Sequence, residues 1–167
     1  MISRSSKVRA WALVAPSVIE FTRRDRYGNL GADQEAAIRA IYGRMPQQVS
    51  GVMVHPTMAE AAERGEYLYF RSDHHWTGLG AYYAYRAFAE SAGFAPVPIG
   101  AYGQPEEIPG FLGSLYRQTR SSRLAENPDV VQYWQPIVAH EYRVYWDDES
   151  RLTPVMDRDL AERERNK

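Results

Sequence analysis

Three consecutive residues in the middle of the chain, Asp73, His74 and His75, combine a carboxylate with two imidazoles. A carboxylate beside an imidazole keeps one ring nitrogen protonated and leaves the other nitrogen free to accept a proton from a nucleophile. In such an arrangement Asp73 orients the ring and His75 is the general base. The spacing therefore indicates the acid and base of a site for nucleophilic catalysis.

The position of this motif in the chain also favours function. Residues 67–70 are aromatic and continuous and predict a strand, and a helical pattern begins near Gly78. The carboxyl end of a strand is where open α/β sheets place their ligands. The positive end of the following helix disfavours an imidazolium, whereas Asp73 favours one, so the sequence leaves the balance between these two effects open.

Two other interpretations of the same residues compete with catalysis. An Asp or Thr just before a helix is most often a cap of that helix. Asp73, His74 and His75 could also be metal ligands. Adjacent histidines in a strand point to opposite faces, however, and no further ligand cluster accompanies them. We therefore expect neither a metal nor a cofactor.

Four further residues are candidates for contacts with a substrate. Trp76 is expected to shield the site by packing, although an exposed aromatic ring can also stack on a sugar. His74, Tyr82 and Ser114 are the other candidates. Ser114 follows Gly113, and a Gly-Ser pair in a loop is usually just part of a turn.

The elements that must position these residues alternate along the first part of the chain. Strands are predicted at residues 8–14, 52–54 and 67–70, and helices at residues 38–45, 57–65 and 79–92, with a capping box formed by Thr57 and Glu60. This βαβαβα order within residues 1–95 predicts an α/β fold with a mostly parallel sheet flanked by helices.

The second part of the chain has a different character. Residues 96–155 are predicted to form long loops and short strands, because Pro and Gly recur and periodicity is weak. Two short β-like runs at residues 130–134 and 142–146 are expected to form a hairpin or edge strands. Residues 156–167 form a charged tail, and we expect residues 1–167 to make a single domain.

Composition excludes several classes of function. The 167 residues are 44% hydrophobic, enough for a core, and the formal net charge of -1 gives no general attraction to nucleic acid. No apolar run is long enough to cross a membrane, and the N-terminus lacks the apolar core of a signal peptide. The chain has no cysteine, which excludes disulfides and leaves the compartment open.

The stretch of residues 69–83, YFRSDHHWTGLGAYY, closely resembles the signature of the bacterial DHHW protein family. That family looks like a branch of the SGNH-hydrolase superfamily, akin to the alginate O-acetyltransferases. Residues 111–116 are similar to a segment that follows the motif in such proteins, so the likeness covers most of the chain. The resemblance implies an SGNH-hydrolase-like (flavodoxin-like) fold, with Asp73 and His75 as members of a Ser-His-Asp triad and no triad role for His74.

One departure from the family concerns the nucleophile. The nucleophilic serine of this branch lies in an Asp-Ser block on a later strand, and no Asp-Ser dipeptide occurs here. The chain is therefore expected to be truncated before that block, to take the nucleophile from another chain, or to be inactive. Ser114 is the best internal substitute, because Ser72 is too close to His75 along the backbone. A sheet left incomplete would expose an edge, which favours a homodimer or a partner chain that completes it.

The resemblance implies an O-acetyltransferase or acetyl esterase of an extracellular polysaccharide, located outside the cell or in the periplasm. Its partners would then be the polysaccharide or an acetyl donor. The alternative is a catalytically inactive carbohydrate-binding or partner domain, in which aromatic residues such as Trp76, Tyr82 and Tyr83 hold a glycan.

Overall fold

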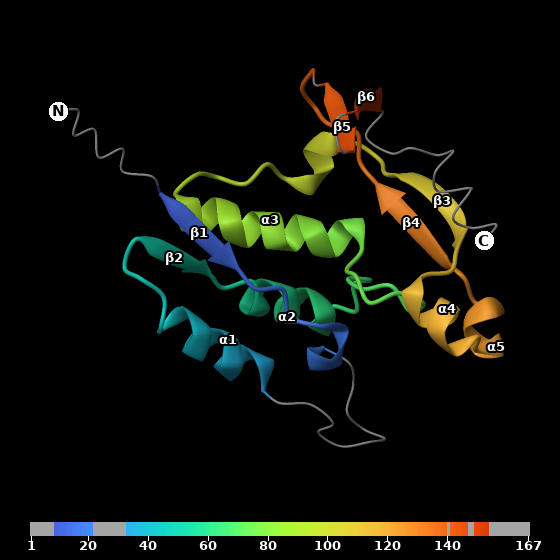
Figure 1. Ribbon diagram of the computed structural model, residues 1–167, viewed down its shortest axis with the longest axis horizontal. Helices are drawn as coiled ribbons and strands as arrows, with labels where there is room; N and C mark the ends of the chain where they lie inside the picture. The colour runs from blue at the N-terminus through green and yellow to red at the C-terminus, as the bar shows by residue number, and fades with distance from the viewer. Residues whose placement is uncertain (1–8, 22–32, 140, 147–148, 154–167) are drawn as a thin grey trace. The chain divides into compact units, whose positions relative to one another are not determined.

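The computed structural model describes residues 9–21, 33–139, 141–146 and 149–153 of this mixed α/β protein (Figure 1). The chain forms two compact units, one made of Met1–Glu66 and Gly80–Pro96 and the other of Tyr67–Leu79 and Val97–Lys167. The expected charged tail at residues 156–167 lies outside the described residues. Among the helices described, none has the length and apolar character needed to cross a membrane.

The first unit is built on one pair of parallel strands. Strand β1 (Ala10–Leu13) pairs with β2 (Val49–Val52), with Ala10 opposite Val49 and Leu13 opposite Val52. The helical elements of this unit are η1 (Val18–Glu20), α1 (Gln34–Tyr42), α2 (His55–Glu63) and residues 80–92 of α3 (Gly78–Ala92). The sequence predicted β1, α1, β2, α2 and α3 in this order. It did not predict η1, and of the second strand predicted at residues 52–54 only Val52 lies in β2.

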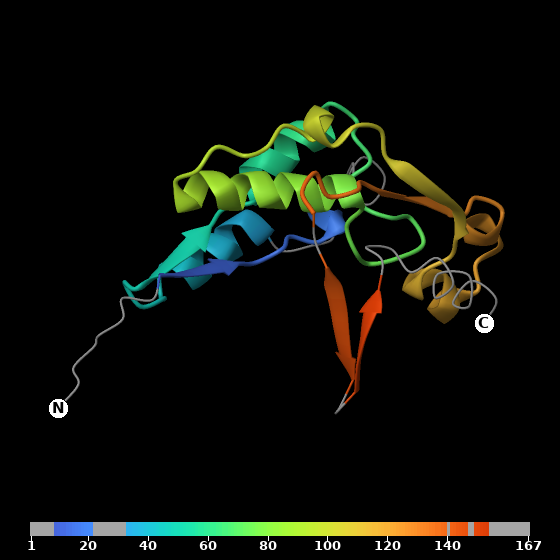
Figure 2. The same ribbon diagram turned by 90° about the horizontal axis from the view of Figure 1, so that it is seen from above.

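Helices α1 and α3 lie on opposite sides of the strand pair in Figure 1, and Figure 2 shows the same unit from above. On the α3 side, the ring of Phe88 packs edge-on against Trp11 of β1, with 5.8 Å between ring centroids. On the α1 side, the hydroxyl of Tyr42 donates to the carbonyl of Val52 at 2.9 Å and accepts from the N–H of Val14 at 2.8 Å. The Tyr42 ring lies so close to β2 that a Cβ at Gly51 would come within 2.5 Å of it.

The residues at the N-termini of α1 and α2 explain where these two helices begin. Helix α1 begins where the Asp33 carboxylate accepts the N–H of Ala36 at 2.9 Å, an N-cap bond. Helix α2 begins at His55, two residues earlier than expected, and its N-cap Val54 makes no side-chain cap bond. The predicted capping box of Thr57 and Glu60 is therefore wrong. Pro56 suits the first turn, because it lacks an N–H that would be unpaired there.

The second unit carries the motif of residues 73–76 on a loop. The strand predicted at residues 67–70 is wrong: the only pairing there is an isolated antiparallel bridge between Tyr69 and Trp76. The backbone closes on itself instead, since the N–H of Phe70 donates to the carbonyl of His75 at 3.3 Å and the N–H of Thr77 donates to that of Leu68 at 2.8 Å. The motif thus lies in a closed loop that leads directly into α3.

Two antiparallel pairs complete the second unit. Strand β3 (Glu106–Phe111) pairs with β4 (Asp129–Tyr133), and β5 (Tyr142–Trp146) pairs with β6 (Glu149–Thr153). The two β-like runs predicted from sequence therefore do form strands. They do not form a hairpin with each other, because each pairs with another segment, and each is instead an edge strand of a two-stranded pair, the other alternative expected. The connection from β3 to β4 contains α4 (Ser114–Thr119) and α5 (Ser122–Ala125), and η2 (Ile99–Tyr102) precedes β3. Parallel pairing in the described residues is confined to β1 and β2.

Candidate active site

Asp73 and His75 form a hydrogen-bonded pair within the loop. His75 Nδ1 lies 2.5 Å from Asp73 Oδ1, and the backbone N–H of His75 donates to the same oxygen at 2.9 Å. The aspartate is buried, whereas 67% of the His75 side chain is exposed. An ionised carboxylate can only accept, so Nδ1 is the protonated nitrogen and Nε2 is the nitrogen left to accept a proton. The contact expected from the sequence between these two residues is thus present.

The second oxygen of Asp73 is held by a residue far along the chain. The N–H of Ser114 donates to Asp73 Oδ2 at 2.7 Å. Burial by itself raises the pKa of Asp73, but the hydrogen bonds from Ser114 and His75 favour the ionised form more strongly and lower the pKa from 3.8 to about 2. The carboxylate is therefore negatively charged at any physiological pH.

Gly113 allows this close approach. It is buried at the start of α4, and a Cβ built there would overlap the Cβ and Oδ2 of Asp73. Its φ of -85° is available to any residue, so the requirement for glycine here is one of space and not of backbone conformation. The pair Gly113-Ser114 therefore has a defined task, which is to bring one backbone N–H against Asp73.

His74 lies beside His75, not opposite to it. The two rings are 3.9 Å apart between centroids and tilted by 38°, and His74 Nδ1 lies 2.6 Å from Ser114 Oγ. The expectation that adjacent histidines point to opposite faces is wrong here, because residues 71–75 form bends and not a strand. His74 and Ser114, two of the predicted substrate-binding candidates, are thus brought together with the Asp73–His75 pair.

The same three side chains are the one group in the described part of the chain with metal-ligand spacing. Ligand atoms of Asp73, His74 and His75 all lie within 4.8 Å of one another. Asp73 already accepts N–H groups at both oxygens, however, and a metal bound through His75 Nδ1 would displace the hydrogen bond between that nitrogen and Asp73 Oδ1. The geometry therefore fits a hydrogen-bonded acid-base pair better than a metal centre.

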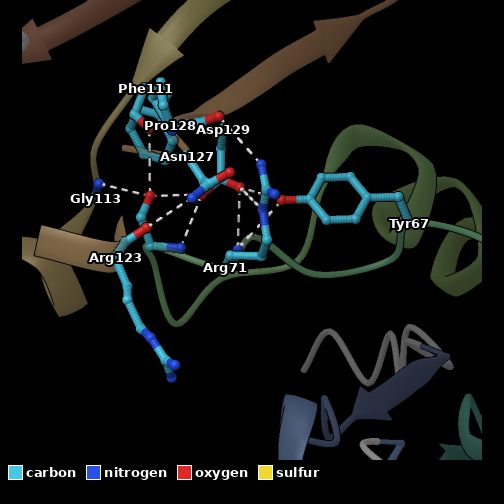
Figure 3. Close-up of polar contacts among 9 residues, drawn as sticks. Tyr67, Arg71, Phe111, Gly113, Arg123, Asn127, Pro128 and Asp129 are labelled. Atoms are coloured by element: carbon cyan, nitrogen blue, oxygen red, sulfur yellow. Dashed lines mark hydrogen bonds and ion pairs between the residues drawn. The ribbon is translucent and has the colours of Figure 1, made fainter. Parts of the chain in front are cut away.

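A second buried aspartate, Asp129, is hydrogen-bonded to the part of the loop that precedes Asp73 (Figure 3). Its side chain is completely buried at the start of β4. Oδ2 accepts the N–H of Ser72 at 2.8 Å and the hydroxyl of Ser72 at 2.5 Å, while Oδ1 accepts the N–H and Nε of Arg71 at 3.2 and 3.0 Å and the hydroxyl of Tyr67. The five donors thus come from residues that precede Asp73.

The electrostatics of this second carboxylate follow from its partners. Burial acts to raise the pKa of Asp129, but hydrogen bonds from Ser72 and Tyr67 outweigh burial, so its pKa is lowered. Burial and the bond to Asp129 together raise the pKa of Tyr67 to about 12. Sequence reasoning missed Asp129, although a carboxylate directly before the β-like run 130–134 was a signal that could have found it, since such residues are rarely buried unless paired.

The structure also describes the two remaining predicted site residues, Trp76 and Tyr82. Trp76 is half-buried and forms the single bridge with Tyr69. Tyr82 belongs to the first unit, where its ring lies 5.7 Å from that of Tyr83 and 6.1 Å from that of Tyr85 between centroids. Tyr83 is 8% exposed, and its hydroxyl donates to Glu66 at 2.6 Å, so it offers no open aromatic face to a glycan.

The fold and the site together define a mixed α/β protein in which a buried aspartate, Asp73, is hydrogen-bonded to an exposed histidine, His75. The family model described as DHHW protein matches residues 3–153, and the chain therefore belongs to the DHHW family. The resemblance of residues 69–83 to that family is thus confirmed.

The chain is also similar to a solved structure, the crystal structure of a DHHW family protein from Eubacterium siraeum. The sequence identity is 32% and the TM-score is 0.69, and the match covers 79% of this chain and 43% of that chain. The chain therefore corresponds to less than half of the length of that protein. No curated protein matches this chain.

Proposed function

We propose that this chain contributes the Asp-His half of an SGNH-type acyl-transfer site, within an SGNH-hydrolase-like (flavodoxin-like) fold. The observation that carries the proposal is the 2.5 Å contact between His75 Nδ1 and Asp73 Oδ1. It joins a buried carboxylate of lowered pKa to an exposed imidazole, which is the relation a general base needs. Membership of the DHHW family, and a parallel strand pair covered by α1 and α3, support the proposal.

In the proposed reaction a serine hydroxyl is the nucleophile. His75 Nε2 takes the hydroxyl proton as the serine oxygen attacks the carbonyl carbon of an acetyl ester, and Asp73 stabilises the imidazolium. The ester C–O bond then breaks, and the departing alcohol takes the proton back from Nε2. The acetyl group, now on the serine, passes in the same way to a sugar hydroxyl or to water.

The hydroxyls of Ser72 and Ser114, near the Asp73–His75 pair, are hydrogen-bonded to residues other than His75. Ser72 is fully buried and its hydroxyl donates to Asp129, while the hydroxyl of Ser114 lies against His74 Nδ1 and not against His75. Within the described residues, no serine hydroxyl is bonded to His75. We therefore propose that the nucleophile comes from a residue outside those described or from a partner chain, with Ser114 as the internal alternative.

The substrate class follows from the family resemblance. We propose an acetyl ester on an extracellular polysaccharide, which makes the protein an O-acetyltransferase or acetyl esterase of the cell exterior or periplasm. Because the chain spans less than half of the matched DHHW protein, this activity is proposed for the whole protein that contains the site. A homodimer or a partner chain that supplies the nucleophile is part of the same proposal.

Fluorophosphonate labelling with peptide mapping tests the proposal. We expect one serine to be labelled in the whole protein that contains the site, alone or with its partner, and the label to be lost in His75→Ala. His74→Ala is the matched control, because it removes the neighbouring exposed imidazole and leaves the Asp73–His75 contact in place. Labelling or acetyl-ester turnover that persists unchanged in His75→Ala would overturn the assignment of the base.

A second candidate function is an inactive carbohydrate-binding or partner domain. The observation that favours it is the absence of a bond between His75 and any serine in the described region. It predicts no labelling at all, together with affinity for an acetylated oligosaccharide that survives His75→Ala. Loss of that affinity in His75→Ala would exclude it.

A further inference from the structure

We propose that Asp129 is a positioning residue that holds the Asp73–His75 pair in its working geometry through Ser72. This role rests on the proposed function only for its effect on rate, because the geometric part can be tested without a substrate. Asp129 touches neither member of the pair. It acts through the loop that carries them (Figure 3).

Asp129 binds the loop directly. Its carboxylate accepts the backbone N–H groups of both Arg71 and Ser72, the two residues just before Asp73. The Nε of Arg71 adds a third bond at 3.0 Å, and the same guanidinium donates to the carbonyl of Pro128 at 3.1 Å. Two successive backbone amides held by one buried carboxylate fix the direction in which the chain enters Asp73.

Ser72 links Asp129 to the segment around Ser114, whose N–H binds Asp73. The Ser72 hydroxyl donates to Asp129 at 2.5 Å and accepts the N–H of Gly113 at 3.0 Å. The carbonyl of Ser72 accepts the N–H groups of Leu115 and Tyr116 at 2.9 and 3.1 Å. These bonds lie on either side of Ser114 in the sequence, so Ser72 fixes the segment whose Ser114 N–H holds Asp73.

Only a carboxylate suits the position of Asp129. The groups that face Oδ1 include the N–H of Arg71, and those that face Oδ2 include the N–H of Ser72. An asparagine would turn its NH2 group toward one of these two amides, whichever way it was oriented, and neither amide can accept. Asp129→Asn therefore keeps the shape of the side chain but loses the hydrogen bond to the backbone N–H of either Arg71 or Ser72.

The effect to be measured is on the tautomer of His75. While Asp73 accepts from Nδ1, the neutral ring carries its proton on Nδ1, because the hydrogen bond at one nitrogen sets the tautomer. If the loop shifts, this preference weakens. Long-range ¹H–¹⁵N NMR of the imidazoles of the 167-residue chain reports the tautomer directly, with His75→Gln used to assign the signal.

We expect His75 to be the Nδ1–H tautomer in the wild type and a mixture in Asp129→Asn, with acetyl-ester turnover lowered roughly 10²-fold, the scale expected for misplaced catalytic groups. Val52→Ala is the control for general destabilisation, since Val52 is fully buried and belongs to the first unit, whereas the loop belongs to the second. It should leave the tautomer unchanged. A folded Asp129→Asn with an unchanged His75 tautomer overturns the proposal.

Ser72→Ala covers the case in which Asp129→Asn does not fold. It keeps the backbone N–H bond to Asp129 and removes the hydroxyl that reaches Gly113. We expect it to shift the tautomer in the same direction, and an unchanged tautomer overturns the proposal. A wild type without ester turnover, but with a tautomer that changes in Asp129→Asn or Ser72→Ala, counts against the proposed reaction and supports the positioning role.

Discussion

The backbone N–H of Ser114 donates to Oδ2 of Asp73 at 2.7 Å, and this bond joins two residues that are 41 positions apart in the sequence. It completes the set of donors around a carboxylate whose other oxygen holds His75. Ser114 therefore contributes to the site through its backbone, whereas its hydroxyl is directed to His74.

Two substitutions at Ser114 separate these contributions. Ser114→Pro removes the N–H at the first position of α4, where proline is otherwise tolerated. We expect the Asp73 pKa to rise and acetyl-ester turnover to fall roughly 10²-fold. Ser114→Ala keeps the N–H and should lower turnover by no more than about tenfold, the value of one ordinary hydrogen bond. A loss of all fluorophosphonate labelling in Ser114→Ala would instead identify Ser114 as the nucleophile.

Gly113→Ala is expected to disrupt the site by steric overlap with Asp73. The added methyl group should cost about 1–3 kcal/mol of unfolding free energy, because the neighbour is a buried side chain held by hydrogen bonds. Thermal and urea unfolding measure the cost. Gly100→Ala is the control, since a Cβ there meets nothing within 4 Å, and it should be neutral or slightly stabilising. Equal stabilities of the two variants would contradict the close packing of Gly113 on Asp73.

Stability should depend on pH through Asp73. Its folded-state pKa of about 2 lies below the ordinary value of 3.8, so the ionised group stabilises the fold above about pH 4, and this contribution is lost as the pH falls toward 2. The loss should be on the order of 2 kcal/mol. Urea unfolding at several pH values should show a shallower decline in Asp73→Asn than in the wild type. The exposed N-cap variant Asp33→Asn is the control. Parallel pH profiles for Asp73→Asn and the wild type would contradict the lowered pKa.

Removal of metals is expected to leave acetyl-ester turnover unchanged. The oxygens of Asp73 are occupied by hydrogen bonds from His75 and Ser114, so the proposed base needs no metal to orient it. Dialysis against EDTA followed by an activity assay tests this expectation. Turnover that falls on dialysis and returns with Zn²⁺ would mean that Asp73, His74 and His75 act as ligands.

Much of the site could be predicted from the sequence because its two central residues, Asp73 and His75, are only two positions apart. A carboxylate two residues before a histidine can reach that ring through local bends alone, and Asp73 and His75 do so. Helices α1 and α3 were readable for a similar reason, since the period of their apolar residues is set within one element. The family signature at residues 69–83 is likewise a property of one short stretch.

The sequence by itself therefore determined the contact between Asp73 and His75, the helix that follows it and the family to which the chain belongs. Tertiary structure decided the rest: residues 67–70 form part of a closed loop, the β-like runs pair with other partners, and Asp129 and Ser114 converge on the loop from distant segments. The physical reason is that strand partners and buried donors are chosen by residues far apart in the chain. The local pattern shows that Asp129 directly precedes a β-like run, but only the fold shows which five donors pair with its carboxylate.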